Sequence, residues 1–219
     1  MKRPMDKNFD YIIQKEINKP NALFFDIGAG QAESINRFKK ILPNCIIHSF
    51  EPVKARIKII EDWLKAFPHN NNITLNHNAI GEKIEEKTFN VNAKTKASSF
   101  LKLNEKNTKD FLKEQVLVKV NTVDNYVKEN NIKCIDYLKI DTQGFEEQVL
   151  KGSIETLKSG MVKYIEIEII LSDYYEKTTN FYDMEKILLP LNYRLYHLQD
   201  IICNDGGQIE QLDALYKLR

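Results

Sequence analysis

The sequence has few cysteines, and their spacing argues against both a zinc site and a set of disulfide bonds. Cys45, Cys134 and Cys203 lie far apart, and none belongs to a Cys-x-x-Cys pair. Neither a structural zinc site nor a disulfide framework is therefore predicted. Free cysteines are typical of the reducing cytoplasm, which is the location that we predict for the protein.

An excess of charge of one sign is also missing. The 32 basic and 31 acidic residues leave a formal net charge of +1. Proteins that capture nucleic acid or an anionic membrane surface by electrostatics usually carry a clear basic excess. The composition therefore predicts no nucleic-acid partner.

Long apolar segments are missing as well. No segment approaches the roughly 20 apolar residues that cross a bilayer, and the basic start of the chain is not followed by the apolar core of a signal peptide. We therefore predict no membrane span. The 219 residues suit one domain of ordinary size, so we expect a helical segment over residues 1–20 and this domain over residues 21–219.

A strand followed by a glycine loop is the most informative pattern in the sequence. The apolar run Leu23–Ile27 contains one charged residue, Asp26, and is followed by Gly28 and Gly30. Glycines permit a tight turn and let a ligand approach the backbone closely. The next segment, Gln31–Leu42, carries apolar residues on one helical stripe, so the pattern predicts a ligand loop between a strand and a helix.

An acidic residue ends the second predicted strand. Glu51 follows the strand Cys45–Phe50 and lies close to the distance after Asp26, roughly 20 residues, at which nucleotide-binding βαβ units place an acid for ribose hydroxyls. A carboxylate accepts hydrogen bonds from both hydroxyls of a ribose and repels a phosphate there. The implied ligand therefore carries an unphosphorylated adenosine ribose.

Two nucleoside ligands fit this pattern, namely a dinucleotide and S-adenosylmethionine. The dinucleotide fingerprint needs a third glycine and places the pyrophosphate at the helix N-terminus. Here the third glycine is missing and Glu33 lies in the first helical turn, where its charge would repel pyrophosphate. Asp26 suits the cationic amine of a methionine group. The loop favours the methyl donor, with a dinucleotide as the alternative.

Strand and helix patterns alternate along the rest of the chain, which predicts a doubly wound α/β domain. The predicted strands are Ile73–Asn78, Thr88–Asn92, Val116–Val120, Ile135–Asp141, Val162–Ile170, Tyr193–Leu198 and Ala214–Leu218. The predicted helices are Ile57–Phe67, Thr122–Val127, Glu146–Lys158 and one that begins after Asn180, whereas Asn104–Glu114 is expected to be a solvated helix or loop. We expect the last two strands to form an antiparallel pair at the sheet edge.

Charged residues lie where a buried strand should be apolar. Alternation places Lys139 and Asp141 on one face of their strand, and Glu166 and Glu168 on one face of the next. Buried charges must pair, contact a ligand or lie at the open carboxyl ends. If the strands are neighbours, Lys139 meets Glu166 or Glu168 across the ladder, and the pair with Glu166 is more structural than catalytic. Asp141 is interpreted as functional, and both roles stay open for Glu168.

Four carboxylates of this region also supply oxygen atoms of the kind that bind divalent cations. They are Asp141, Glu166, Glu168 and Asp173, and their spacing matches no defined metal-binding loop. We therefore predict no metal site.

Several motifs, in order along Leu23–Leu198, resemble those of the FkbM-type methyltransferases. These motifs are Asp26–Gly30, Ser49–Pro52, Asn78–Gly81, Ser98–Ser99, Val120–Asp124 and Leu138–Glu146. The first two are shared with many class I methyltransferases, whereas the last is specific to the family. The sequence departs from the family pattern at Gly30, where Asn is usual, and at Ala32, where Gly is usual.

The resemblance implies an S-adenosylmethionine-dependent methyltransferase domain over residues 21–219. Its fold would be a mostly parallel, seven-stranded, Rossmann-like sheet whose last strand is antiparallel. Its reaction would be O-methylation of a hydroxyl group on a sugar, glycan or other small-molecule natural product. The alternatives are a nicotinamide-dependent oxidoreductase on the same architecture and a non-catalytic nucleoside-binding protein.

The resemblance also implies roles for particular residues. Cofactor binding would involve Asp26, Gly28, Gly30, Glu51, Asn78, Ala79, Asp141 and Gln143, with the first three at the methionine end, Glu51 at the ribose and Asn78 at the adenine. Asp141 or Glu168 would take the proton of an unactivated acceptor hydroxyl, and Lys139 would set the protonation state of that carboxylate.

Overall fold

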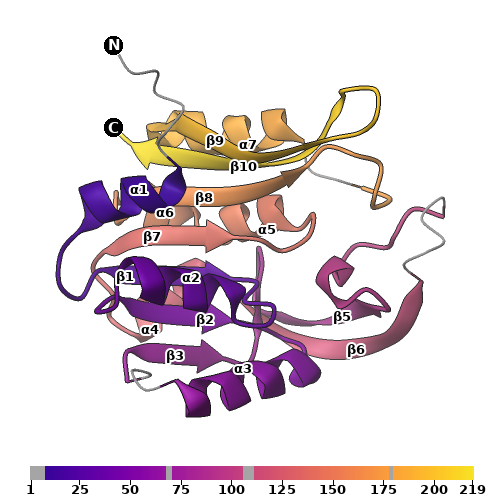
Figure 1. Cartoon of the computed structure of the whole chain (residues 1–219), viewed down its shortest axis with the longest axis horizontal. Coiled ribbons are helices and arrows are strands. Elements are labelled where there is room, and N and C mark those ends of the chain that lie inside the picture. The colour runs from indigo at the N-terminus through magenta and orange to yellow at the C-terminus, as the bar shows by residue number, and fades with distance from the viewer. Residues whose placement is uncertain (1–7, 68–70, 106–110, 178–179) are drawn as a thin grey trace.

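A seven-stranded sheet forms the centre of the computed structural model, which describes residues 8–67, 71–105, 111–177 and 180–219 (Figure 1). Its strands are β1 (Leu23–Ile27), β2 (Ile46–Phe50), β3 (Ile73–Asn76), β7 (Ile135–Ile140), β8 (Val162–Ile170), β9 (Tyr193–Cys203) and β10 (Ile209–Leu218). They are arranged in the order β3-β2-β1-β7-β8-β10-β9. Residues 1–7 of the predicted helical segment lie outside the described residues.

The directions of these strands confirm the predicted fold class. The pairs β2–β3, β1–β2, β1–β7 and β7–β8 are parallel, whereas β10 is antiparallel to both β8 and β9. The last two strands therefore pair as predicted. The edge strand is β9 alone, because β10 lies between it and β8.

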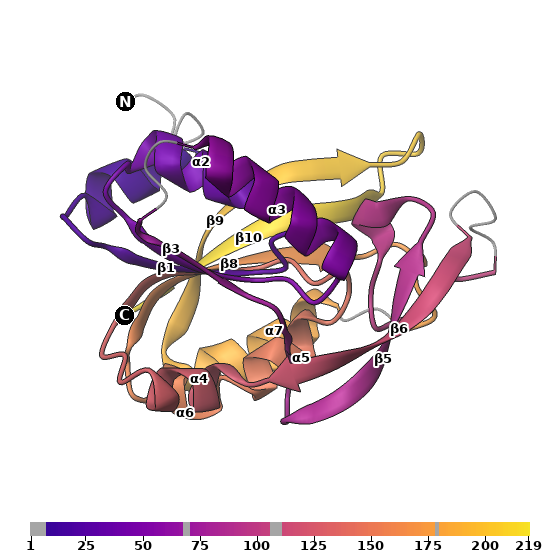
Figure 2. The same ribbon diagram turned by 90° about the horizontal axis from the view of Figure 1, so that it is seen from below.

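Helices cover both faces of the sheet (Figure 2). The helices are α1 (Phe9–Ile12), a π-helical turn η2 (Ile13–Ile17), α2 (Glu33–Ile41), α3 (Lys54–Ala66), α4 (Val123–Glu129), α5 (Glu146–Lys151), α6 (Ile154–Lys158) and α7 (Phe181–Leu188). The apolar residues of α1, η2, α2 and α3 pack on one face, and those of α4 to α7 pack on the other. This is the doubly wound arrangement that the alternation of strands and helices predicted. No helix in the described part of the chain is long and apolar enough to cross a membrane.

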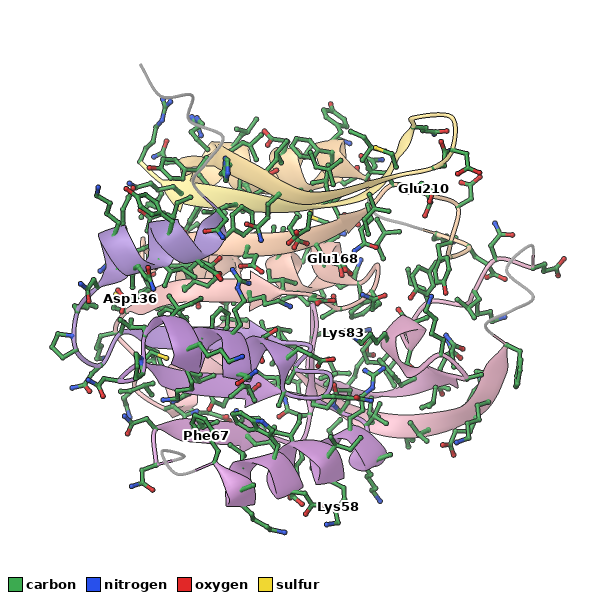
Figure 3. All side chains as sticks on the ribbon, viewed as in Figure 1. Lys58, Phe67, Lys83, Asp136, Glu168 and Glu210 are labelled. Atoms are coloured by element: carbon green, nitrogen blue, oxygen red, sulfur yellow. The ribbon has the colours of Figure 1, made fainter. Side chains whose placement is uncertain are left out.

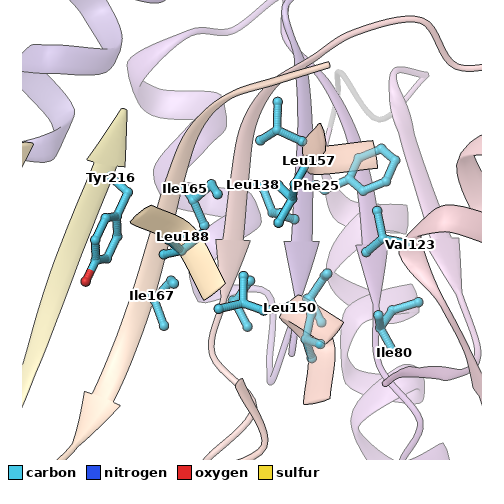
Figure 4. Close-up of a cluster of buried hydrophobic side chains, with 14 of the residues drawn as sticks. Phe25, Ile80, Val123, Leu138, Leu150, Leu157, Ile165, Ile167, Leu188 and Tyr216 are labelled. Carbon is cyan, nitrogen blue, oxygen red and sulfur yellow. The ribbon is translucent and has the colours of Figure 1, made fainter. Parts of the chain in front are cut away.

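The larger apolar core lies between the central strands and α4 to α7 (Figure 4). Leu138 and Ile165 from neighbouring strands and Leu150 and Leu188 from the covering helices are fully buried. Burying one such side chain contributes about 1.5–3 kcal/mol to stability. The core therefore fixes the strands whose carboxyl ends carry the predicted site.

A separate three-stranded sheet adjoins the carboxyl ends of β1 to β3 (Figure 2). Its strands are β4 (Ala79–Ile80), β5 (Glu85–Asn92) and β6 (Leu112–Asn121). The strands predicted over Thr88–Asn92 and Val116–Val120 are confirmed as parts of it, but their separation from the main sheet was not predicted. The strand predicted over Ile73–Asn78 leaves the main sheet after Asn76, and the chain then pairs with β6. Leu112–Glu114 belong to β6 rather than to the expected helix or loop, while residues 106–110 of that segment lie outside the described residues.

The single helix predicted over Glu146–Lys158 is wrong, because the chain forms α5 and α6 with a break at Gly152. A Cβ atom at Gly152 would lie 1.9 Å from the carbonyl oxygen of Gly81, so only glycine fits this contact. The carboxylate of Asp124 then accepts hydrogen bonds from the N–H groups of Glu155 (3.1 Å) and Thr156 (2.8 Å). These bonds satisfy donors at the start of α6.

Two other helices begin where the sequence predicted, and a third begins two residues later. Thr122 caps α4 by accepting the N–H of Asn125 (3.0 Å), and Asn180 caps α7 by accepting the N–H of Asp183 (3.1 Å). The helix predicted from Gln31 begins at Glu33 instead. Its preceding residue, Ala32, has a left-handed backbone with φ of 75°, which cannot continue a right-handed helix.

Candidate functional site

A cavity of about 500 Å³ lies at the carboxyl ends of the central parallel strands. It is located where the strand order reverses between β1 and β7, the usual ligand site of an open α/β sheet. Its walls come from the glycine loop after β1, the end of β2, the small sheet, the loop after β7, and the ends of β8 and β10 that face them. A second wall of the site is thus supplied by the small sheet.

Most of the predicted site residues line this cavity, and three do not. The lining includes Gly28, Gly30, Glu51, Ala79, Asp141, Gln143 and Glu168. Asp26 and Lys139 are buried outside the lining. Asn78 also lies outside it, in the turn between β3 and β4, where its amide donates to the carbonyl oxygen of Ala79 (3.0 Å). The role of Asn78 at an adenine stays a prediction.

The glycine loop closely approaches the loop after β7. Gly28 has φ of +89°, and a Cβ atom there would lie 1.9 Å from the carbonyl oxygen of Asp141. The N–H of Asp141 donates to the carbonyl oxygen of Ile27 (3.0 Å). Glycine therefore brings Gly30 and Asp141 to opposite sides of one narrow cavity.

Glu51 anchors the glycine loop from β2. It is fully buried, and its carboxylate accepts hydrogen bonds from the N–H groups of Gly30 (3.1 Å) and Val53 (2.9 Å). Burial raises the pKa of Glu51, although the nearby Arg56 and the two backbone donors counteract that effect. The acid predicted to bind a ribose thus faces the cavity beside the glycine loop.

A row of polar residues crosses the sheet on the face covered by α2. Asp26 lies opposite Ser49 on β2 and Lys139 on β7, and Lys139 lies opposite Glu166 on β8. One oxygen of Asp26 accepts the hydroxyl of Ser49 (2.8 Å), and the other is buried without a hydrogen-bond partner among the described residues. Burial raises the pKa of Asp26, and Lys139 opposes this shift. The row supports the cavity from outside its lining.

The ion pair expected between Lys139 and Glu166 or Glu168 does not form. The Lys139 Nζ atom contacts Asp141 instead (2.7 Å). Glu166 accepts hydrogen bonds from the guanidinium of Arg37 (2.8 Å) and from the hydroxyl of Tyr137. Arg37 of α2 reaches across the sheet face and binds Glu166 in place of Lys139. The two strands are nevertheless neighbours, and Lys139 lies opposite Glu166, one of the two acids expected across the ladder.

The contact between Lys139 and Asp141 fixes the charge of both groups. Burial disfavours the charged lysine, but the carboxylates of Asp141 and Asp26 outweigh burial and raise the pKa of Lys139. Burial likewise disfavours the charged acid, yet Lys139 and the amide of Gln143 lower the pKa of Asp141. Asp141 is therefore ionised at neutral pH.

Gln143 connects the two carboxylates at the cavity floor. Its amide nitrogen donates to Asp141 (3.0 Å) and to Glu168, while its amide oxygen accepts the hydroxyl of Tyr175 (3.2 Å). Its backbone is left-handed with φ of +58°, and its carbonyl oxygen accepts the hydroxyl of Ser99 (2.7 Å). The small-sheet segment thus holds this amide in a conformation that a non-glycine residue rarely adopts.

Glu168 is the second carboxyl group of the site, and its pKa shifts in the opposite direction to that of Asp141. Its other oxygen accepts the side-chain amide of Gln211 (2.7 Å), which approaches from β10. Burial, followed by the negative charges of Asp141 and Glu146, raises the pKa of Glu168 well above its ordinary value. Figure 3 shows Glu168 at the cavity end of the sheet, far from Asp136 at the opposite end. The site thus holds one carboxyl group whose pKa is lowered and one whose pKa is raised.

Glu146, the last residue of the Leu138–Glu146 motif, organises the loop between these two acids, a role that the motif alone did not predict. It is 1% exposed, and one of its oxygens accepts the N–H groups of Thr142 (2.8 Å) and Gly144 (3.1 Å). Burial raises the pKa of Glu146 to about 7. The folded protein therefore holds a proton that the unfolded chain releases above its ordinary pKa near 4.5.

This proton predicts a pH-dependent stability. Because the folded state binds the proton more tightly, the contribution of Glu146 to the free energy of unfolding falls by about 3 kcal/mol as pH rises from 4.5 to 7. Above pH 7 the contribution levels off. Glu146→Gln should remove this contribution, so that the free energy of unfolding falls less steeply with pH than in the wild type. Urea denaturation at a series of pH values measures this slope. Glu147→Gln, next to it and paired with Lys151 at the surface, is the control and should leave the slope unchanged. An identical slope in Glu146→Gln and the wild type would contradict this origin.

Two arginines and a glutamine at the site were missed by sequence reasoning. Arg56 lines the cavity beside Glu51, Arg37 binds Glu166, and Gln211 binds Glu168. A sequence signal for Arg56 existed: it lies four residues before Ile60 and therefore on the same, buried face of the helix. Gln211 carried no such signal, because its position depends on β10 pairing with β8.

The described residues contain no group of three or more His, Cys, Asp and Glu side chains arranged to hold a metal ion. The carboxylates at the cavity floor are instead occupied by Lys139 and by side-chain amides. The absence of a metal site stays a prediction.

Comparisons with known proteins agree with this architecture. The sequence matches the family described as "Methyltransferase FkbM domain" over residues 9–195. A methyltransferase FkbM from Methylobacillus flagellatus is similar in structure, with a TM-score of 0.60 and 15% identity over 90% of this chain and 43% of that chain. A magnesium protoporphyrin IX methyltransferase from Synechocystis with bound SAM gives a TM-score of 0.55 and 9% identity over 96% of this chain and 76% of that chain. No curated protein matches the sequence significantly.

Methyltransferases of other kinds share the fold. A precorrin-6y C5,15-methyltransferase from Geobacter metallireducens gives a TM-score of 0.53 and 13% identity over 96% of this chain and 87% of that chain. At these identities the likeness concerns the fold alone. The sheet and its cavity thus define a Rossmann-like domain of the class I methyltransferase type.

Within that class, the chain belongs to the FkbM methyltransferase family, as the resemblance of its motifs predicted. The chain spans less than half the length of the Methylobacillus protein, 43% of it.

Proposed function

We propose that the protein is an S-adenosylmethionine-dependent methyltransferase that acts on a hydroxyl group of a sugar, glycan or other small-molecule natural product. The observation that carries this proposal is the single cavity that joins the glycine loop and Glu51 on one side to Asp141, Gln143 and Glu168 on the other. Membership of the FkbM family supports it. Cysteine usage supports a cytoplasmic location as part of the same proposal.

The residues of the cavity fit the proposed cofactor. Glu51 offers a buried carboxylate for the ribose hydroxyls, and two structures of the same fold contain SAM or S-adenosylhomocysteine. Asp26 has a buried oxygen without a hydrogen-bond partner among the described residues, next to Lys139 and the glycine loop. When bound, the cofactor supplies an activated methyl group, so the protein has mainly to align the reactants and exclude water.

Glu168 is the carboxyl group best suited to accept the proton of the acceptor hydroxyl. Asp141 is held ionised by Lys139, which makes it a weak base. Glu168 has a raised pKa and lies in the cavity lining, and a base is most effective when its pKa is close to the working pH. Asp141 and Gln143 would then lie beside the transferable methyl group of the cofactor, with Gln143 positioning Glu168.

The acceptor side of the cavity combines apolar and polar groups. Phe100 and Ser98 line it from the small-sheet side, Ile170 and Ile202 line it from the main sheet, and Tyr174 lines it from the loop after β8. This mixture suits a small hydroxylated molecule. A protein from Streptococcus pneumoniae described as a "putative tRNA (m1A22) methyltransferase" shares the fold, with a TM-score of 0.53, but the net charge of +1 of this chain supports no nucleic-acid acceptor.

A nicotinamide-dependent oxidoreductase is the alternative that the structure favours least. Glu33 begins α2, and its carboxylate accepts the N–H of Gln31 (2.9 Å) and contacts Lys96 (3.1 Å). Backbone donation from Gln31 and the charge of Lys96 outweigh burial and lower the pKa of Glu33. A negative charge therefore occupies the helix N-terminus where a dinucleotide would place its pyrophosphate.

Thermal melting with two ligands tests the proposal. S-adenosylhomocysteine should raise the melting temperature, because a ligand that binds only the folded state stabilises that state, whereas NAD should leave it unchanged. A shift with NAD alone would end the methyltransferase proposal. Binding of S-adenosylhomocysteine without methyl transfer to any of a broad panel of hydroxylated acceptors would favour a non-catalytic nucleoside-binding protein.

A further inference from the structure

An arginine with an unused donor faces the proposed ribose site. Arg56, in the first turn of α3, lines the cavity although it is only 9% exposed. Its Nη1 atom lies 3.5 Å from the carboxylate of Glu51. Its Nη2 atom is buried and has no hydrogen-bond partner among the described residues.

The lack of a partner distinguishes Arg56 from an ordinary structural arginine. A guanidinium has five N–H donors, and buried donors are rarely left unpaired because burial removes the water that would otherwise satisfy them. Glu51 already accepts one backbone N–H on each of its two oxygens. It therefore has no need of the second nitrogen of Arg56, and that nitrogen is available to a ligand in the cavity.

The chemistry of a ribose fits this pair of residues. Each ribose hydroxyl donates one hydrogen bond and also accepts, whereas a carboxylate only accepts and a guanidinium only donates. Glu51 can accept hydrogen bonds from the hydroxyls, and the hydroxyl oxygens can then accept a hydrogen bond from a donor. From these contacts we infer that Arg56 donates through Nη2 to a ribose hydroxyl oxygen of the bound cofactor and so completes the recognition that Glu51 begins. This inference rests on the proposed function.

Titration calorimetry with hydroxyl-deleted ligands tests the inference. The ligands are S-adenosylhomocysteine and its 2′-deoxy and 3′-deoxy analogues, and the variants are Arg56→Lys and Arg56→Met. Both variants should weaken binding of S-adenosylhomocysteine by about tenfold, the usual effect of losing a charge-assisted hydrogen bond. For one deoxy analogue the same variants should change affinity by less than about twofold, because the ligand group that Arg56 contacts is already missing.

Arg56→Lys distinguishes a direct hydrogen bond to the ribose from an indirect role in which Arg56 only positions Glu51. Lysine keeps a positive charge beside Glu51 but lacks the second nitrogen, so full affinity in Arg56→Lys would overturn the inference. Equal losses for all three ligands would also overturn it, since Arg56 would then act only by positioning Glu51. The control Lys54→Met removes an exposed positive charge from the same helical turn and should leave every affinity unchanged.

The outcome for the wild type keeps the two proposals apart. If wild-type protein does not bind S-adenosylhomocysteine, the proposed function fails and the inference about Arg56 fails with it. If the wild type binds and only the pattern among the variants differs from expectation, the proposed function stands and the role of Arg56 alone is overturned. Melting temperatures of the unliganded variants show whether each one is folded.

Discussion

We expect Glu168→Gln to slow methyl transfer by about a hundredfold or more while leaving the affinity for S-adenosylhomocysteine nearly unchanged. Glu168 has the raised pKa of a useful base, and its carboxyl group lies in the cavity lining between the amides of Gln143 and Gln211. Glutamine has nearly the same shape but cannot accept the acceptor's proton. The loss should therefore appear in turnover and not in cofactor binding.

The measurement is the rate of S-adenosylhomocysteine formation with a hydroxylated acceptor that the wild type methylates. Glu210→Gln is the matched control, because Glu210 also lines the cavity and carries a carboxylate (Figure 3). It should retain most of the wild-type rate. Equal rates for Glu168→Gln and the wild type, together with a large loss in Asp141→Asn, would assign the proton transfer to Asp141 instead.

The pH profile gives this assignment a second test. Burial and neighbouring negative charges raise the pKa of Glu168, and a carboxyl group acts as a base only after it has lost its proton. Turnover of the wild type should therefore rise with pH through a range above the ordinary pKa of a glutamate. Asp141 has a lowered pKa and is already ionised, so a reaction that used it as the base would not show this rise.

The main sheet and the glycine loop were predictable because their signals are local. Strands β1 and β2 are short, mainly apolar runs, and β7 and β8 are rich in β-branched and aromatic residues; most positions of all four strands are buried, which is the physical reason for that pattern. Glu51 and Asp141 follow two of these strands directly, so strand ends alone placed them at one edge of the sheet. The parallel direction of the strands was enough to predict that Glu51 and Asp141 lie near each other.

The small sheet and the arginine contacts were not predictable in the same way. Strand β4 has two residues, too few for any alternation, and it pairs with β6 across a long stretch of sequence. Helical periodicity treats arginine as a surface residue. Arg37 and Arg56 instead lie over apolar surface and extend their guanidinium groups to buried acids. The partner of a long side chain depends on packing between elements, which local patterns do not contain.

The second large effect concerns Gly28, where we expect Gly28→Ala to lower the free energy of unfolding by about 4 kcal/mol or more. Two separate costs add at this position. The backbone has φ of +89°, which side-chain-bearing residues rarely adopt, and the new Cβ would lie 1.9 Å from the carbonyl oxygen of Asp141. That oxygen belongs to the backbone and cannot rotate away, so the two loops must separate.

Gly207→Ala isolates the first cost from the second. Gly207 lies in the turn between β9 and β10 with φ of +82°, and a Cβ atom there would meet nothing within 4 Å. Its substitution should cost only about 1 kcal/mol, the usual penalty for a positive φ. Urea denaturation measures both variants. The difference between them is the contribution of the close approach of the two loops, and the same separation should abolish binding of S-adenosylhomocysteine in Gly28→Ala alone. Equal losses of stability in the two variants would show that the contact between Gly28 and Asp141 does not hold the cavity together.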